Sequence, residues 1–443
     1  MVLTQCAACA APLGLSLGKK CGRCSTRYCG RTCQEYHWKE GGHDKLCKQI
    51  KRSGGAEQYN ANNKYTEAVA AAVEKCEDDT KGQTCYICLE AVHPRTGEGL
   101  VRGCACGDRD GVASGSTGVA HVSCLAEQAK ILVAEAEENK LDIKVWNERW
   151  DRWHTCSLCE QEYHGVVYCA LGWACWKTYL GRPEADQTRL LAISQLGHGL
   201  SSSEHHEDAL SVKEAELSMR RRLGDSEQII LAVQANLAGS YSLSGRDAQA
   251  LDLLRDIYPG FLKHYGEEND QTLGLALNYA SALGVLGRFE EAKSLLRKSI
   301  PVARRVLGEE FNTTVLMGRL YAEALCKDGR ASRDDKVEAV AMLEELSPIA
   351  RRVFGPLHPT TTGIQCSLTT ARRKLLLCLR FAIGARVECL ISDDTWVPGR
   401  VIKLHYHESG FEPGYFAPYQ IELDDGGLIY APDDDDECIR AAS

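Results

Sequence analysis

The chain has 443 residues, too many for one compact core, so roughly two to four domains are expected. Hydrophobic residues make up 44%, charged residues 26%, and the formal net charge is −9, a balance typical of globular proteins. No run of about 18 apolar residues indicates a membrane span, and the cysteine-rich N-terminus lacks the basic start of a signal peptide. We therefore expect a soluble intracellular protein, cytoplasmic or nuclear, without membrane partners.

Cysteines are unevenly distributed along the chain. Of 22 cysteines, fifteen lie between residues 6 and 159, most of them in tight CxxC and CxC pairs. In a reducing compartment such pairs are more often zinc ligands than disulfides. The N-terminal third of the chain is therefore predicted to bind metal.

The first predicted metal module covers residues 1–52. Two CxxC pairs, a further cysteine pair and an HxxxC pair provide eight ligands, enough for two tetrahedral sites. A tight turn in CxxC points both sulfurs at one ion, and residues four apart in HxxxC share a helix face. A segment this short buries little apolar area, so the metal must supply folding free energy. The predicted ligands are Cys6, Cys9, Cys21, Cys24, Cys29, Cys33, His43 and Cys47.

The stretch "RYCGRTCQEYHWKEGGHDKLC" closely resembles the MYND zinc finger, and the resemblance covers about residues 6–47. It implies interleaved ligands, with the first and third cysteine pairs on one zinc and the second pair, His43 and Cys47 on the other. His37 is the alternative to His43, which we prefer because it forms HxxxC with Cys47. MYND fingers take short proline-containing peptides, so the resemblance gives Gln34 and Trp38 as contacts. Trp38 could equally form the small core of the finger.

The front of the chain is basic, although the whole chain is acidic. Residues 1–52 carry ten Lys or Arg against three Asp or Glu, while the C-terminus has an acidic stretch, Asp433 to Glu437. A basic excess can indicate nucleic-acid binding. Seven thiolates around two Zn²⁺ would add about −3 to this segment. We therefore interpret the basic side chains as solvating a metal-rich domain, and nucleic acid is not an expected partner.

The second predicted metal module covers residues 82–180 and follows a helical linker at 53–81. A CxxC pair in "CYICLE" is followed by CxC, HxxC and a last CxxC, again eight ligands in four pairs. A redox CxxC needs no such additional pairs, so two zinc ions are expected rather than a redox site. The predicted ligands are Cys85, Cys88, Cys104, Cys106, His121, Cys124, Cys156 and Cys159.

The order of these pairs resembles the RING-CH variant of ubiquitin-ligase zinc domains, supported by "GCACG", "VAHVSCL" and "WHTCSLCEQEYHG". The resemblance implies a cross-brace, in which the first and third pairs hold one zinc and the second and fourth the other. Such a domain forms no covalent intermediate and docks a ubiquitin-conjugating enzyme on a shallow apolar groove. Ile87 matches the groove residue of that family, and Leu125 and Leu158 are weaker candidates. The alternative for Ile87 is a buried packing residue.

Some features depart from the RING-CH pattern. Residues 107–120 are rich in Gly, Ser and Asp and read as a flexible inserted loop. Residues 125–153 read as a charged amphipathic helix, and Glu160 stands where active RING domains often place a cation. Whether the module recruits an enzyme or only folds is therefore left open. Cys169 and Cys175 lie in an apolar stretch, which favours buried thiols over spare ligands.

Residues 188–380 contain an internal repeat. Gly224, Gly266 and Gly308 are 42 residues apart, Gly355 follows after 47, and each ends a helical pattern. Recurring alanines fit positions where helices touch, and glycines fit C-caps. The spacing predicts four helix pairs and a closing helix at about 361–380, stacked as an α-solenoid.

The repeat resembles tetratricopeptide repeats of the kinesin-light-chain type. Such arrays bind peptides in a concave groove, and the resemblance gives Asn236 and Asn278 as contacts to the peptide backbone; ordinary surface polarity is the alternative. A proline lies seven residues before each of the last three closing glycines, at Pro259, Pro301 and Pro348. Because proline removes a helical hydrogen bond, a kink or break is predicted at each site.

Residues 383–441 change to a period of two, with "DDGG" as a hairpin turn. The length fits a small antiparallel β-barrel of about five strands, which weakly resembles Tudor-like barrels. Aromatic side chains could fill its core or form a cage for a methylated cation. They are Trp396, Tyr406, Tyr415, Phe416, Tyr419 and Tyr430.

The predicted fold is multidomain and mainly α, with two zinc-stabilised modules, an α-solenoid and a C-terminal β-barrel. Four Zn²⁺ ions are expected, two in each module, and no catalytic residue is predicted. The first hypothesis is an adaptor acting as a RING-type ubiquitin ligase, in which repeats and MYND finger recruit protein targets. The second is a non-catalytic zinc-stabilised scaffold for protein interaction.

Overall fold

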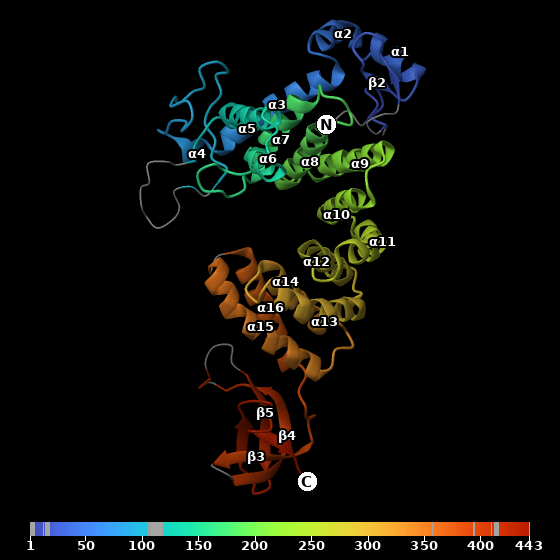
Figure 1. Ribbon diagram of the computed structural model, residues 1–443. Helices are drawn as coiled ribbons and strands as arrows, with labels where there is room; N and C mark the ends of the chain where they lie inside the picture. The colour runs from blue at the N-terminus through green and yellow to red at the C-terminus, as the bar shows by residue number, and fades with distance from the viewer. Residues whose placement is uncertain are drawn as a thin grey trace. The chain divides into compact units, whose positions relative to one another are not determined.

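The structure is a computed structural model that describes residues 5–11, 13, 18–104, 106, 118–356, 358–392, 395–408, 410–411 and 416–442. Contacts divide the chain into two compact units, Met1–Phe261 and Leu262–Ser443. The chain is mainly helical, and an antiparallel sheet forms near its C-terminus (Figure 1). Across the described ranges, no helix is long and apolar enough to cross a membrane.

The first unit begins with a small finger. Strands β1 (Lys19–Lys20) and β2 (Arg27–Tyr28) pair antiparallel, and helices α1 (Arg31–Lys39) and α2 (His43–Arg52) follow. Tyr28 is fully buried and packs among the cysteines of this segment. No residue of α1 is buried, so this helix stands on the surface of the finger.

Helix α7 (Gly165–Tyr179) is the centre of the next part of the first unit. Ten of its fifteen residues are buried, and they lie on every side of the helix. The helix packs against α3 (Ala56–Lys75), α5 (Val122–Glu138) and α8 (Gln187–Ser202). A helix that is apolar all round requires such an environment. The segment predicted as a helical linker thus contains α3, which packs against α7. Two short helices complete the region, α4 (Glu77–Thr80) and α6 (Ile143–Trp150), with a 3₁₀ turn at Asp151–Trp153.

Paired helices fill the rest of the first unit. Helix α8 packs against α9 (His206–Leu223), which packs against α10 (Glu227–Leu243), and α11 (Asp247–Tyr265) follows. Gly224 ends α9 in the left-handed conformation with φ 75°, which glycine adopts without strain. The recurring glycine therefore acts as the helix C-cap that the sequence predicts at this position.

The second unit continues the pairs. Helices α12 (Asp270–Val285), α13 (Phe289–Val306), α14 (Asn312–Lys327), α15 (Arg333–Phe354) and α16 (Pro359–Leu376) each pack against the next (Figure 1). The three second helices α11, α13 and α15 continue across their prolines, so the predicted breaks are absent. Buried neighbours such as Ile300 beside Pro301 hold the helix despite the one lost hydrogen bond.

The C-terminal sheet has five antiparallel strands in the order β6-β5-β4-β3-β7. The predicted closed barrel is wrong, because β6 and β7 remain open edges among the described residues. The connection between them carries Asp434, which accepts from Arg333 Nε at 3.2 Å and Arg380 Nε at 2.8 Å. The strands are β3 (Arg386–Ser392), β4 (Thr395–Tyr406), β5 (Ala417–Leu423), β6 (Leu428–Ala431) and β7 (Ile439–Ala441).

Candidate metal centres and partner surfaces

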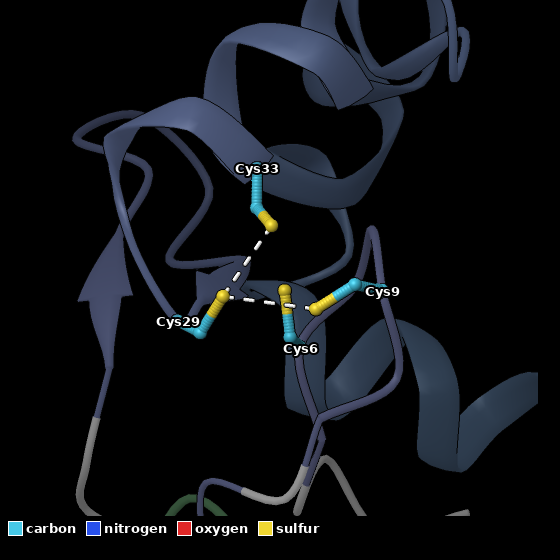
Figure 2. A group of neighbouring side chains, drawn as sticks. All are labelled: Cys6, Cys9, Cys29 and Cys33. Atoms are coloured by element: carbon cyan, nitrogen blue, oxygen red, sulfur yellow. Dashed lines mark hydrogen bonds between the residues drawn. The ribbon is translucent and has the colours of Figure 1, made fainter.

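The finger brings four cysteines together at its first candidate centre. Figure 2 shows the sulfurs of Cys6, Cys9, Cys29 and Cys33 pointing toward one another. The Cys9 and Cys29 sulfurs lie 3.6 Å apart, and the Cys29 and Cys33 sulfurs 3.3 Å apart. Cys29 follows β2 and Cys33 lies in the first turn of α1, so the strand and the helix position this half of the centre.

The second candidate centre of the finger is fully buried. His43 and Cys47 share one face of α2 and meet Cys21 and Cys24 from the turn before β2. The sulfurs of Cys21 and Cys47 lie 3.9 Å apart, and His43 Nε2 lies 3.4 Å from Cys24 Sγ. Burial lowers the pKa of His43, which favours the neutral imidazole that binds metal. The alternative ligand, His37, lies outside this group, with its Nδ1 3.0 Å from the Tyr28 hydroxyl.

The second module gathers its ligands in two sets. Cys85 and Cys88 lie with His121 and Cys124, and the His121 Nδ1 is 3.4 Å from Cys88 Sγ and 3.7 Å from Cys124 Sγ. Burial also lowers the pKa of His121. This set joins the first ligand pair to the third, as in a cross-brace.

The other set joins the second pair to the fourth. Cys104 and Cys106 lie with Cys156 and Cys159, and the sulfurs of Cys106 and Cys156 are 3.6 Å apart. Gly118 lies against this set with φ +63°, and a Cβ there would stand 2.8 Å from Cys104 Sγ. Only glycine fits this approach of the backbone to the thiols.

All four sets have dimensions that fit Zn²⁺. Zn–S bonds of about 2.3 Å in a tetrahedron separate sulfurs by about 3.8 Å, and a nitrogen from a sulfur by about 3.6 Å. The observed sulfur separations of 3.3–3.9 Å and nitrogen–sulfur separations of 3.4–3.7 Å are close to these values. A disulfide would need about 2.05 Å. Every set supplies four thiol or imidazole donors, the ligand number of a structural zinc site.

The two candidate peptide contacts of the finger lie on α1. Trp38 is 41% exposed and Gln34 is half-buried. Trp38 therefore does not form the core of the finger; the fully buried Tyr28 has that place. Tyr36 on the same helix is 59% exposed, an additional aromatic side chain that the sequence pattern did not single out.

The candidate groove residues of the second module differ in exposure. Ile87 is half-buried and Leu158 is 42% exposed, whereas Leu125 is buried. Tyr86 precedes Ile87 and Ser157 precedes Leu158. The Tyr86 hydroxyl and Ser157 Oγ are 3.1 Å apart, so the two loops contact each other directly. Two zinc-binding loops thus meet beside these apolar side chains. Most of the predicted insertion at 107–120 lies outside the described residues.

The remaining candidates are distributed over separate elements. Asn236 is exposed on α10 and Asn278 is exposed on α12. Cys169 and Cys175 are buried in α7 and lie outside the candidate metal groups found among the described residues. In the sheet, Tyr419 belongs to the core and its hydroxyl accepts from the Phe381 N–H, whereas Tyr415 lies outside the described residues.

Comparison with known families identifies two of these parts. Residues 6–47 match the model of the MYND finger, and residues 272–312, from α12 through α13, match that of a tetratricopeptide repeat. Neither match covers residues 85–159, so the RING-CH resemblance rests on the residues alone. No curated protein matches the chain.

Several solved structures are similar to parts of the chain. A Podosopora anserina protein described as a kinesin light chain, with nearly identical TPR-like repeats, is 18% identical, with a TM-score of 0.35, covering 52% of this chain and 97% of that one. BtubC from P. vanneervenii is 12% identical, with a TM-score of 0.32, and the match covers 62% of this chain and 97% of that one. The TPR2AB domain of yeast Sti1, in its pHSP90 complex, is 11% identical, with a TM-score of 0.20. That match covers 56% of this chain and 99% of the Sti1 domain.

The chain thus combines a MYND finger, a tetratricopeptide repeat and further Cys/His clusters suited to zinc. These are modules of protein interaction. The coarse description that follows is a zinc-binding adaptor that contacts protein partners.

Proposed function

We propose that the chain is a zinc-dependent adaptor that binds four Zn²⁺ ions and presents separate surfaces to different protein partners. The observation that carries the proposal is the closure of all four Cys/His sets. Each set has four protein donors, so a bound zinc ion has no open position for substrate and serves the fold. The surfaces that remain for function are those of the elements that the ions hold, above all α1 and the repeat helices.

Metal content tests the number of ions. Native mass spectrometry of the full chain should find four zinc ions. Cys156→Ser should lose one, and Cys24→Ser should lose both ions of the finger, because its two ligand sets interleave. Two or fewer ions in the unaltered chain would show that one module does not bind zinc as proposed.

The peptide surface of the finger is proposed on α1, with Trp38 and Gln34 receiving a proline-containing segment. Trp38 is exposed, and a partly exposed indole offers a large apolar contact at low conformational cost. Titration of the zinc-loaded chain with a proline-rich peptide should show binding that Trp38→Ala removes. Phe416→Ala, an aromatic change of similar exposure just before β5, is the control. Equal binding by both variants would contradict this site.

The repeat helices are proposed to bind an extended peptide, with Asn236 and Asn278 as contacts to its backbone. Both amides are exposed on first helices of consecutive pairs. An immobilised peptide library screened against the full chain identifies a ligand, and Asn278→Ala should then weaken it by about 1 kcal/mol or more. The exposed Lys298→Ala is the control. Unchanged affinity of the Asn278→Ala variant would show that this asparagine is an ordinary polar surface residue and not a peptide contact.

A second candidate function is recruitment of a ubiquitin-conjugating enzyme by the second module. The link between Tyr86 and Ser157 favours it, because it brings the loops of Ile87 and Leu158 together beside the exposed Leu89 and Val92. Docking of such an enzyme would use these apolar side chains, as the RING-CH resemblance implies. In the alternative, the module is a non-catalytic scaffold.

Autoubiquitination with a panel of conjugating enzymes separates the two candidates. Activity that Ile87→Ala or Leu158→Asp abolishes, while Ile143→Asp retains it, would support docking at this surface. Ile143 is 72% exposed on α6 and so reports on a general effect of a new surface charge. No ubiquitin transfer across the panel would leave the scaffold as the function of this module.

A further inference from the structure

Helix α2 of the finger has a basic face opposite its metal ligands. His43, Cys47 and Ile50 are buried on one side of the helix. Lys45, Lys48 and Arg52 are exposed and, at 100° per residue, fall on the opposite side. We define these three residues as the α2 basic face.

The cations of the α2 basic face have no acidic partners. None of the three side chains takes part in an ion pair or hydrogen bond within the ranges that the structure describes. Elsewhere exposed cations are commonly paired, for example Arg31 with Glu35 on α1 and Arg305 with Glu268 in the repeats. Asp44 is the only acidic residue of α2. Within the described ranges the face is therefore a positively charged surface without ion pairs of its own.

The helix dipole accounts for only part of this charge. Basic residues in the last turn stabilise a helix, which explains Arg52 and its neighbour Lys51. Lys45 lies in the first turn, where a cation is unfavourable, and Lys48 stands three residues from it, where like charges repel. Asp44, four residues before Lys48, favours that lysine on an isolated helix. Lys45 is therefore the cation that a role in binding explains better than a role in folding.

We propose that the α2 basic face binds a short acidic segment of a partner protein. From Lys45 to Arg52 the helix rises about 10 Å, a distance that an extended chain covers in about three residues. A run of three or four acidic side chains can thus reach all three cations. The site is on a different helix from Trp38 and does not depend on the proline-peptide proposal.

Fluorescence anisotropy with the zinc-loaded full chain tests the proposal. The probe is a labelled peptide with four consecutive glutamates, titrated at low and at physiological ionic strength. Binding should weaken with salt, because exposed charges are screened. The triple variant K45E/K48E/R52E should bind about tenfold more weakly or worse, and K45Q/K48Q/R52Q should fall between.

The controls make the result specific. K140E/K144E/K298E changes the net charge equally at exposed positions on other elements and should bind like the unaltered chain. Zinc content shows whether each variant keeps its finger. Undiminished binding by K45E/K48E/R52E with full zinc content would overturn the proposal. So would tighter binding of a single-stranded oligonucleotide of matched charge, because the face would then serve nucleic acid.

Discussion

The two zinc modules differ in how much fold surrounds their metal ligands. In the MYND finger, the buried core consists of four ligand cysteines with Leu13, Tyr28, Ile50 and Ala56. In the second module, the ligands share a core with aliphatic side chains of several elements, including Leu100, Val101, Val122, Leu125 and Leu171. Four-donor metal sets thus occur in two settings: a finger with a very small apolar core, and a second module whose loops pack against helices α5 and α7.

The difference teaches what the metal contributes in each place. A segment with so small a core depends on its ions for most of its folding free energy. Helix α7 also belongs to a separate apolar cluster with Trp150, Trp153 and Ile193, which needs no metal. Loss of zinc should therefore unfold the finger and only loosen the loops of the second module.

The largest effect is expected from Cys24→Ser. The substitution removes one of four donors from the fully buried centre that joins α2 to the rest of the finger. Binding of structural zinc contributes on the order of 10 kcal/mol to small domains, so the finger should unfold. Hydrogen exchange read by mass spectrometry should show loss of protection over 18–52 and unchanged protection in α7. Protection retained over α2 would contradict the dependence on zinc.

Cys156→Ser should have a smaller and more local effect. The centre of Cys104, Cys106 and Cys159 would lose its ion, and the loops around it would open. Helices α5 and α7 should stay protected, because both also contribute to a separate apolar cluster, with Val133 on α5 and Trp173 on α7, that contains no predicted ligand. The same exchange measurement checks this. Full loss of protection in α7 would show that both modules depend equally on metal.

A smaller effect is expected where the second module meets the first repeat helix. Glu137 on α5 accepts from both terminal nitrogens of Arg182, at 2.8 and 2.7 Å, and from Thr188 Oγ1 at 2.7 Å. Glu137→Gln should lower the free energy of unfolding of the first unit by about 1–2 kcal/mol. Thermal unfolding of the variant and of the unaltered chain measures this loss of stability. Glu138→Gln, exposed on the same helix, should change little.

The Glu137 effect has a defined pH dependence. Hydrogen bonds from Arg182 hold the pKa of Glu137 below its usual range. A carboxylate with a depressed pKa stabilises the fold above its unfolded pKa, about 4.3, and the contribution disappears as pH falls through the lower folded value. The difference between the Glu137→Gln variant and the unaltered chain should thus be constant from pH 8 to about 5 and shrink below about 4. A difference that grows on acidification would contradict this account.

Local sequence patterns predict most of what short-range geometry determines. A CxxC turn or an HxxxC helix face depends on a few residues, so each ligand pair can be read from its spacing. The repeat helices follow their glycine and alanine period in the same way, and their tetratricopeptide character is confirmed over 272–312. Which pairs share an ion depends on contacts between distant residues, and for that the family resemblance was needed.

Local patterns did not predict the open C-terminal sheet or the helices that continue across Pro259, Pro301 and Pro348. The strand order leaves β6 and β7 as edges among the described residues, and strand order depends on pairing between residues that lie far apart in the sequence. The segment at 53–81 contains helix α3, and its packing against α7 involves residues far along the chain, which no local pattern indicates. The sequence left Trp38 open as a peptide contact or as the core of the finger, and it did not single out Tyr28 on β2, which is the buried aromatic side chain.

The smallest effect is expected at the surface of the finger. It tests the comparison of the two modules at a side chain that neither binds metal nor belongs to the buried core. If zinc and the Tyr28 core hold the finger, Trp38 on α1 should add little, since α1 has no buried residue. Trp38→Ala should therefore change the free energy of unfolding by no more than about 0.5 kcal/mol, whereas Tyr28→Ala should cost about 3 kcal/mol or more. Exchange protection over 18–52, measured at fixed zinc concentration, compares the two. A loss at Trp38→Ala as large as that at Tyr28→Ala would mean that α1 packs as part of the core, and Trp38 would no longer be available to a partner.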